Sequence, residues 1–218
     1  MTDHLRSSQR SMVEIKRIPG KAFSSNVYIV RSQKNFIVDA GAGPVKRIYD
    51  YVDSEGLEID RIILTHRHFD HVGGAEKLSD MLDVPIYAHE LAAKALREGD
   101  DRTIISNSFG KEVSGVDVKV LEEDTYAGFL KIHTPGHTNC SICLYHGGDK
   151  ILISGDTVFS GGGVGRSDLP TGDFEELKNS VEKLTRYDVY SLYPGHGPSI
   201  KQEGNEHIRL SLQNMSYL

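Results

Sequence analysis

The chain has 218 residues, of which 38% are hydrophobic and 26% charged, a balance typical of a folded globular protein rather than a disordered one. Its formal net charge is −6, and no segment combines clustered Lys and Arg with aromatic residues, so the sequence carries no nucleic-acid-binding signature. No apolar run is long enough to cross a bilayer, and residues 1–20 lack the apolar centre of a secretion signal. Two cysteines, Cys140 and Cys143, are too few for a disulfide framework, and we expect a reducing, cytoplasmic setting.

The first half of the chain alternates predicted strands and helices. Residues 1–10 are polar and are expected to form a flexible tail, with residues 11–218 as a single domain. Apolar runs and alternating patterns predict strands at 13–18, 26–32, 35–41, 59–65 and 84–89. Apolar residues at helical spacing predict helices at 44–56, 75–83 and 90–99. Strands that alternate with helices favour sheets covered by helices.

The second half is richer in strands. Four short candidates follow one another with polar turns between them, a pattern typical of a meander, at 116–121, 129–134, 141–146 and 150–156. A helix is predicted at 173–186 with Asp173 as its N-cap, followed by a strand at 189–195 and a closing helix at 205–216. The glycine-rich stretch 160–166 lies closely between predicted elements, which indicates a loop rather than a linker.

Three histidines and one aspartate stand within six positions directly after the predicted strand 59–65. His66 and His68 are two residues apart, so strand alternation would point both to the same face, where they could share one cation. Asp70 and His71 follow at the turn into a helix and are placed to address a second cation beside the first. Imidazole and carboxylate ligands suit zinc and also accept iron, manganese or nickel.

Two cations need more ligands than one loop supplies, and three distant segments offer them. Each segment is a predicted strand that runs into a glycine-containing turn, and the side chains there are His137, Asp156 and His196. Glycine and proline let the backbone turn sharply at these points. Because open α/β sheets commonly collect their ligands at strand ends, we predict that the four segments converge on one metal centre.

The four motifs resemble those of the metallo-β-lactamase superfamily over essentially the whole chain beyond the tail: THRHFDH at 65–71, HTPGHT at 133–138, GDT at 155–157 and PGHG at 194–197. Within the superfamily, glyoxalase II and its short relatives are most similar, particularly to FSGGGVGRSDLPTGD at 159–173. The resemblance implies an α/β fold of the αββα type, a four-layer sandwich with two mixed β-sheets flanked by helices. It also implies two divalent ions, with zinc expected and iron or manganese as alternatives. The implied ligands are His66, His68 and His137 for the first ion, Asp70, His71 and His196 for the second, and Asp156 as a bridge.

The resemblance further implies a binuclear hydrolase of the hydroxyacylglutathione hydrolase type. Its substrate would be a small-molecule thioester of glutathione or another thiol. Paired metal ions lower the pKa of a water to about 7, so a hydroxide held between them attacks without a serine or cysteine nucleophile. Asp70 would be a ligand that also orients this hydroxide, and the thiolate would leave without a general acid.

Other functions stay open at the level of sequence. A persulfide dioxygenase shares most of the motifs and would use one iron held by His66, His137 and Asp156, a facial triad with open positions. A lactonase or an RNA-processing nuclease would use two metals, although the acidic balance and the lack of an RNA-binding insertion disfavour the nuclease. A non-enzymatic binding module on a decayed site is disfavoured because every implied ligand position is filled.

The glycine-rich loop also contains Arg166 and Asp168. By resemblance, Arg166 is expected to pair with Asp168 or with a metal-bound carboxylate and so to hold the metal ligands in their orientation. The alternative is an ion pair on the surface that contributes little to stability.

Four residues outside the motifs are weaker candidates for chemistry. Cys140 and Cys143 are expected to be buried free thiols on opposite faces of a strand. His89 stands at a strand-to-helix junction, where capping or packing is expected. His146 has no partner pattern and is expected to be solvated.

Overall fold

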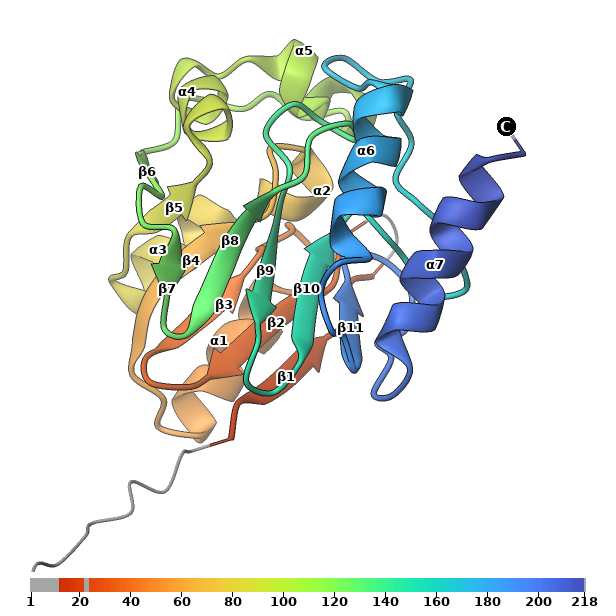
Figure 1. The fold of residues 1–218 in the computed structure, drawn as a ribbon. Helices are drawn as coiled ribbons and strands as arrows, with labels where there is room; N and C mark the ends of the chain where they lie inside the picture. The colour runs from red at the N-terminus through yellow and green to blue at the C-terminus, as the bar shows by residue number, and fades with distance from the viewer. Residues whose placement is uncertain (1–11, 22–23, 218) are drawn as a thin grey trace, which may run out of the picture.

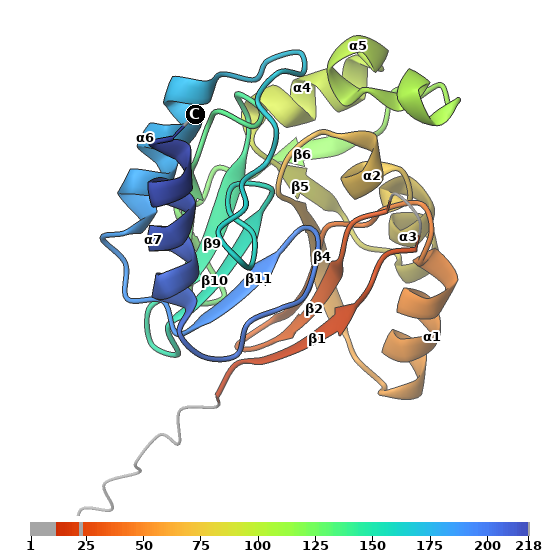
Figure 2. The ribbon, with the colours of Figure 1, turned by 90° about the vertical axis from the view of Figure 1, so that its right-hand side faces the viewer.

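In the structure of the protein, a computed structural model, two mixed β-sheets face each other and helices cover the outer face of each (Figure 1). Figure 2 shows the four layers from the side. Helices α6 (Phe174–Leu184) and α7 (Gly204–Met215) lie on one side, and α1 (Val45–Ser54) and α3 (Ala75–Leu82) on the other. The predicted αββα sandwich of two mixed sheets is confirmed.

The structure describes residues 12–21 and 24–217, so the tail predicted at 1–10 lies outside the described residues. The first sheet contains, in spatial order, β1 (Glu14–Ile18), β2 (Val27–Arg31), β3 (Asn35–Val38), β4 (Ile59–Leu64), β5 (Ile86–Ala88) and β6 (Val118–Val120). β1 to β3 are antiparallel neighbours, whereas β3 to β6 are parallel. The prediction that residues 116–121 join the meander is therefore wrong. Because α4 (Glu90–Glu98) connects β5 to β6, the connection is a helical crossover, which produces a parallel pair.

The second sheet contains, in spatial order, β11 (Ser191–Pro194), β10 (Ile151–Gly155), β9 (Ile142–His146), β8 (Phe129–His133) and β7 (Thr125–Tyr126). β7 to β10 form an antiparallel meander, which confirms the prediction for its last three strands. β11 pairs with β10 in parallel after the crossover through α6. β8, β10 and β11 therefore run in the same direction and end at the same edge of the sheet.

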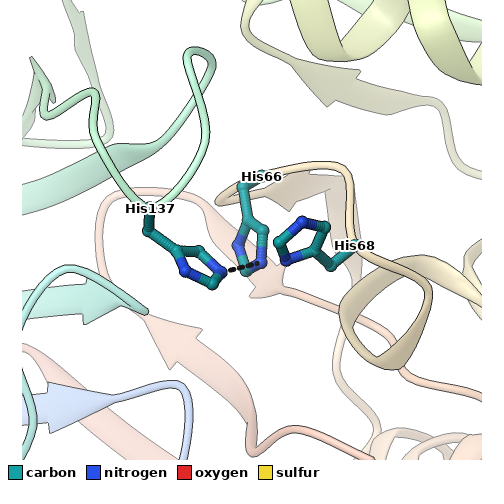
Figure 3. Close-up of side chains that lie close together, drawn as sticks. All are labelled: His66, His68 and His137. Atoms are coloured by element: carbon teal, nitrogen blue, oxygen red, sulfur yellow. Dashed lines mark hydrogen bonds between the residues drawn. The ribbon is translucent and has the colours of Figure 1, made fainter. Parts of the chain in front are cut away.

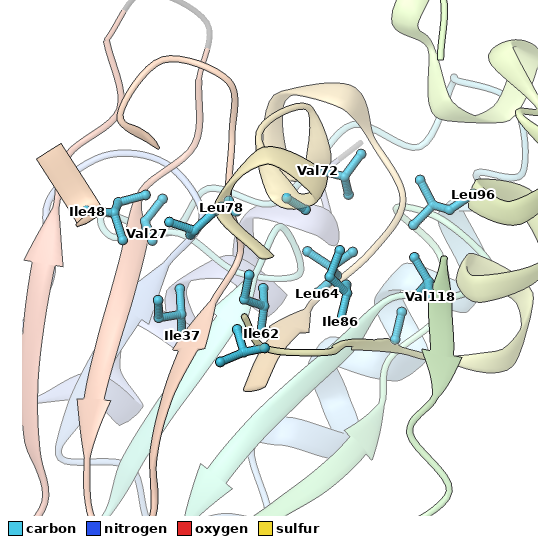
Figure 4. Close-up of a cluster of buried hydrophobic side chains, with 14 of the residues drawn as sticks. Val27, Ile37, Ile48, Ile62, Leu64, Val72, Leu78, Ile86, Leu96 and Val118 are labelled. Carbon is cyan, nitrogen blue, oxygen red and sulfur yellow. The ribbon is translucent and has the colours of Figure 1, made fainter. Parts of the chain in front are cut away.

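Side-chain alternation along β4 explains how the core is divided. Ile62 and Leu64 pack with Ile48 and Leu78 beneath the helices that cover the first sheet (Figure 4). Ile63 points the other way, into the core between the sheets. Burying one such side chain contributes about 1.5–3 kcal/mol, so both faces hold this strand firmly in register. The register matters because the HxHxDH motif begins directly beyond its end.

The remaining helices surround the ends of the strands. α2 (Phe69–Val72) was not predicted: Asp70 and His71 lie within this short helix rather than at a turn before the helix predicted at 75–83. Asp173 caps α6 by accepting a hydrogen bond from the Glu176 amide at 2.9 Å, and His89 caps α4, so both capping predictions are confirmed. α5 (Asp101–Ile104) and the 3₁₀-helix η1 (Ser106–Phe109) were not predicted. Among the described residues, no helix has the length and apolar character needed to span a membrane.

The cysteines and His146 differ partly from expectation. Both thiols are buried and free, but Cys140 lies in the turn before β9, and only Cys143 is in the strand. They pack in different clusters, Cys140 beneath the helices of the first sheet and Cys143 beneath α6 and α7. His146 is buried rather than solvated, because the β9–β10 turn folds back and the Asp149 amide donates to its Nδ1 at 3.1 Å.

Candidate metal centre

The ends of four strands bring the sequence-predicted ligands together. The HxHxDH motif follows β4, and the other three segments follow β8, β10 and β11. Their imidazole and carboxylate atoms form three groups, and within each group the atoms lie within 4.8 Å of one another. The groups are His66, His68 and His137; His66, His71 and Asp156; and Asp70, His71 and His196. The predicted convergence of the four segments is therefore present in the structure.

The first group consists of three buried imidazoles that point toward a common centre (Figure 3). His137 Nε2 lies 3.3 Å from His66 Nε2, and the rings of His68 and His137 meet edge to face at 4.6 Å. His68 Nε2 is buried and has no hydrogen-bond partner among the described residues. Because a buried polar nitrogen normally has a partner, this atom indicates a ligand that the polypeptide does not supply.

The second group adds carboxylates. His71 Nε2 lies 3.3 Å from His196 Nε2 and 3.2 Å from Asp156 Oδ1. His196 Nε2 lies 3.0 Å from Asp70 Oδ2. The other oxygen of Asp156, Oδ2, is 3.7 Å from His137 Nε2, so this carboxylate extends between the two groups. The two oxygens of Asp156 therefore face one imidazole from each group.

Hydrogen bonds behind the rings determine which ring nitrogens carry protons. His137 Nδ1 lies 2.7 Å from the backbone carbonyl of Arg166, and a carbonyl can only accept, so Nδ1 must donate. His71 Nδ1 faces Asp39 Oδ2 at 2.8 Å and donates for the same reason. In the neutral form of both rings, Nε2 therefore presents a lone pair toward the centre, as a metal ligand must.

Asp39 also acts on the first group through Thr65. Its two oxygens accept from the Thr65 amide at 2.7 Å and from the Thr65 hydroxyl at 2.9 Å. Because that hydroxyl proton is already used, the Thr65 oxygen accepts from His66 Nδ1 at 3.1 Å, which leaves a lone pair on His66 Nε2. A single buried carboxylate thus orients one imidazole in each group. Sequence reasoning missed Asp39, although it directly follows the end of β3, as Asp156 follows β10.

The electrostatics of the cluster favour a bound cation. Burial lowers the pKa of His66 well below its usual value and that of His68 to about 3, so these rings are neutral. Burial would raise the pKa of Asp156, but the neighbouring His71 and His137 hold it well below the usual value, so Asp156 is ionised. Burial likewise opposes a charge on His71, yet Asp156 and Asp39 raise its pKa well above normal. A proton on His71 thus offsets the carboxylates until a metal ion replaces it, and the donor set fits divalent ions.

Two glycines permit the close approach of the segments. A Cβ at Gly195 would lie 2.1 Å from Asp156 Oδ1 and 2.6 Å from His71 Cε1. A Cβ at Gly165 would lie 2.7 Å from His137 Nδ1. Only glycine fits at either position, because these neighbours are the atoms that form the centre and its hydrogen bonds.

Arg166 contacts the centre through its backbone. Its carbonyl is the partner of His137, whereas its guanidinium forms two hydrogen bonds with the Asp168 carboxylate at 2.7 and 2.6 Å. Both side chains are more than 60% exposed, so their pairing is a surface ion pair, the second of the two alternatives.

Arg67 is a buried residue that sequence reasoning did not single out. Its guanidinium donates to Cys140 Sγ at 3.1 Å, to Thr103 Oγ1 at 3.2 Å and to the side chain of Asn139. These contacts join the HxHxDH loop to the loop of His137 and to α5. The arginine therefore positions three segments around the centre.

A cavity of about 470 Å³ opens onto the centre. It is lined by metal-centre residues, by the segment around η1 and by the glycine-rich loop: His68, Asp70, Ile105, Ser108, Phe109, His137, Asp156, Phe159, Gly165, Arg166, Leu169 and His196. Small-molecule sites commonly have volumes of about 300–1,000 Å³, so the cavity can admit a small substrate to the predicted ligands.

Known proteins share both the sequence and the fold. A sequence profile of the metallo-beta-lactamase superfamily matches residues 20–196. A probable metallo-hydrolase of Methanocaldococcus jannaschii is 36% identical, covering 84% of this chain and 92% of its own. A hydroxyacylglutathione hydrolase of Haemophilus influenzae is 30% identical, covering 85% and 91%. The crystal structure of the B3 metallo-beta-lactamase BLEG-1 is 28% identical and aligns with a TM-score of 0.78, covering 91% of this chain and all of its own. A crystal structure of a second protein, in a di-iron-bound form, is also 28% identical and aligns with a TM-score of 0.77, covering 93% of this chain and all of its own. With its profile match, its fold and its convergent ligands, the chain belongs to the metallo-beta-lactamase superfamily.

Proposed function

We propose that the chain is a binuclear metal hydrolase that cleaves small-molecule thioesters, as a hydroxyacylglutathione hydrolase does. The observation that carries the proposal is the convergence of seven ligand side chains in three overlapping groups. A mononuclear iron enzyme would need only His66, His137 and Asp156, and would leave the group of Asp70, His71 and His196 without a role. Two ions account for all seven residues. The relative from Haemophilus influenzae supports the choice of substrate.

The ligand residues would divide between two positions. His66, His68 and His137 would hold one ion and Asp70, His71 and His196 the other, with Asp156 reaching both. Divalent ions bound there, with zinc expected, supply Lewis acidity and lower the pKa of water to about 7. Asp39 and Thr65 keep the ring protons on the nitrogens that face away from the ions.

The rest of the cavity would bind and orient the thioester. Asp70 lines the cavity and presents a carboxylate that can orient a water toward the substrate carbonyl. Neither Cys140 nor Cys143 lines the cavity, so a covalent acyl-cysteine route has no nucleophile in place. A thiolate is a good leaving group, so cleavage needs no further proton donor.

Metal quantification together with a substrate panel tests the proposal. The panel contains S-lactoylglutathione, other thioesters, a lactone, a β-lactam and glutathione persulfide, the last with oxygen consumption recorded. We expect thioester hydrolysis that a chelator abolishes and added metal restores. Asp156→Ala should lower kcat/KM by more than the roughly 10–100-fold loss that is typical when a residue hydrogen-bonded to a metal ligand is replaced. Asp188→Ala is the matched control, because this exposed aspartate lies outside the cavity. Full thioesterase activity in metal-free protein would refute the proposal.

A further inference from the structure

Two segments of the chain each contribute an apolar wall to the cavity beside the metal centre. Ile105 and Phe109, from the segment that links α5 to the end of η1, form one wall. Phe159 and Leu169, from the glycine-rich loop, form the other. Holding metal ions requires none of these four side chains, so they are available to contact the substrate.

Ile105 is held in a backbone conformation that isoleucine rarely adopts. Its φ is 58°, in the left-handed region, where a β-branched side chain is strained. Glycine or asparagine would adopt this conformation more readily. The left-handed conformation of Ile105 directs two adjacent isoleucine side chains to different places: Ile104 is fully buried in the core, whereas Ile105 lines the cavity. Such strain persists only where its surroundings impose it, and it concentrates at functional sites.

The wall is anchored rather than loose. Thr103 donates its hydroxyl to the N-cap Asp100 at 2.7 Å and accepts from the buried Arg67 at 3.2 Å. At the other end, the ring of Phe109 packs against that of Phe69 with their centroids 5.4 Å apart. A wall fixed before the substrate arrives lowers the entropy cost of binding.

We propose that this cavity selects thioesters that carry an apolar group next to the scissile bond, and that Ile105 and Phe109 set this preference. The inference rests on the proposed hydrolase function. The apolar group can belong to the acyl or to the thiol part, since either adjoins the carbonyl carbon. Each added methylene that fits against the wall should raise kcat/KM by about fourfold or more.

The test uses the metal-loaded full chain and two series of thioesters. One series varies the acyl group from acetyl to isovaleryl on N-acetylcysteamine, and the other keeps acetyl and varies the thiol from mercaptoethanol to butanethiol. Ile105→Gly should lower the preference for the apolar member by about tenfold. Its thermal midpoint should stay the same or rise, because glycine relieves the strain. Phe109→Ala should lower the same preference without raising the thermal midpoint.

Asp83→Gly is the matched control. Asp83 is exposed at the end of α3 with φ of 53°, so glycine brings the same backbone relief outside the cavity. It should leave the preference unchanged. A response in the acyl series alone assigns the apolar group to the acyl part, and a response in the thiol series alone assigns it to the thiol; either supports the inference. Equal kcat/KM across both series, or an unchanged preference in Ile105→Gly and Phe109→Ala, would overturn the inference and leave thioester hydrolysis standing. No turnover of any thioester would overturn both.

Discussion

Replacing Asp39 by asparagine removes a charge and one acceptor from behind the metal centre while keeping the shape of the side chain. In the wild type, the carboxylate accepts from the Thr65 amide, the Thr65 hydroxyl and His71 Nδ1, all within 2.9 Å. Whichever way the new amide points, its NH₂ group faces a donor. It meets either the Thr65 amide or the pair formed by the Thr65 hydroxyl and His71 Nδ1. In the second orientation, His71 would have to carry its proton on Nε2, where a metal ligand needs a lone pair.

The expected losses follow from these contacts. Leaving a buried donor without an acceptor costs about 1–3 kcal/mol of unfolding free energy. Losing the contact that orients a ligand lowers metal affinity by about 10–100-fold, which equals about 1.4–2.7 kcal/mol. Competition with a chelator, followed by metal quantification, measures the affinity of Asp39→Asn. Asp60→Asn is the control, since Asp60 also accepts from several side chains but lies outside the centre; it should lower stability alone. Wild-type metal affinity in folded Asp39→Asn would refute the role assigned to Asp39.

Three further predictions concern titration, thiols and the glycine-rich loop. In the metal-free chain, burial lowers the pKa of His68 to about 3, whereas nearby carboxylates raise that of His71 well above 6.5 despite burial. Titration of His68 therefore lowers the stability of the folded chain as pH falls below 6.5, and titration of His71 lowers it as pH rises above 6.5 through the folded pKa. The thermal midpoint should accordingly peak near pH 6.5. A midpoint that rises steadily with pH would contradict this prediction. Burial raises the pKa of Cys143 to about 11 and Cys140 is also buried, so a thiol reagent should label both only after unfolding; rapid labelling of the native chain would disagree. Arg166→Ala should keep wild-type metal affinity, because its contact to the adjacent imidazole uses the backbone carbonyl; weaker binding would mean that the guanidinium matters.

Sequence alone was sufficient for the set of converging residues, because their chemistry is rare and their positions share one form. His137 and His196 stand just beyond a predicted strand and Asp156 is the last residue of one; each directly follows a glycine, and parallel strand ends meet at one edge. Asp39 lies inside a predicted strand and two residues before a glycine, and a single aspartate in such a place is too common to stand out. Arg67 was missed for another reason: its partners Thr103 and Cys140 are 36 and 73 residues away, and no local pattern encodes such contacts.

The fold was predictable where periodic segments are long and less so where they are short. The prediction of β4 succeeded because it contains a continuous run of branched apolar residues, and that of α6 because its apolar residues repeat at the helix period. α5 and η1 have four residues each, too few for any period to show. β6 joins the first sheet because a helical crossover connects it to β5, and its own three residues do not encode that pairing. The left-handed turn at Ile105 could not be predicted, because isoleucine disfavours it and only tertiary contacts impose it.

The most direct measurement for the binuclear centre is metal quantification combined with X-ray absorption at the metal edge on the purified, metal-loaded chain. We expect two ions per chain, with nitrogen and oxygen ligands and a metal–metal distance of about 3.5–4 Å. A single ion per chain that stays single in excess metal, with no metal neighbour, would contradict the account and favour a mononuclear site at His66, His137 and Asp156.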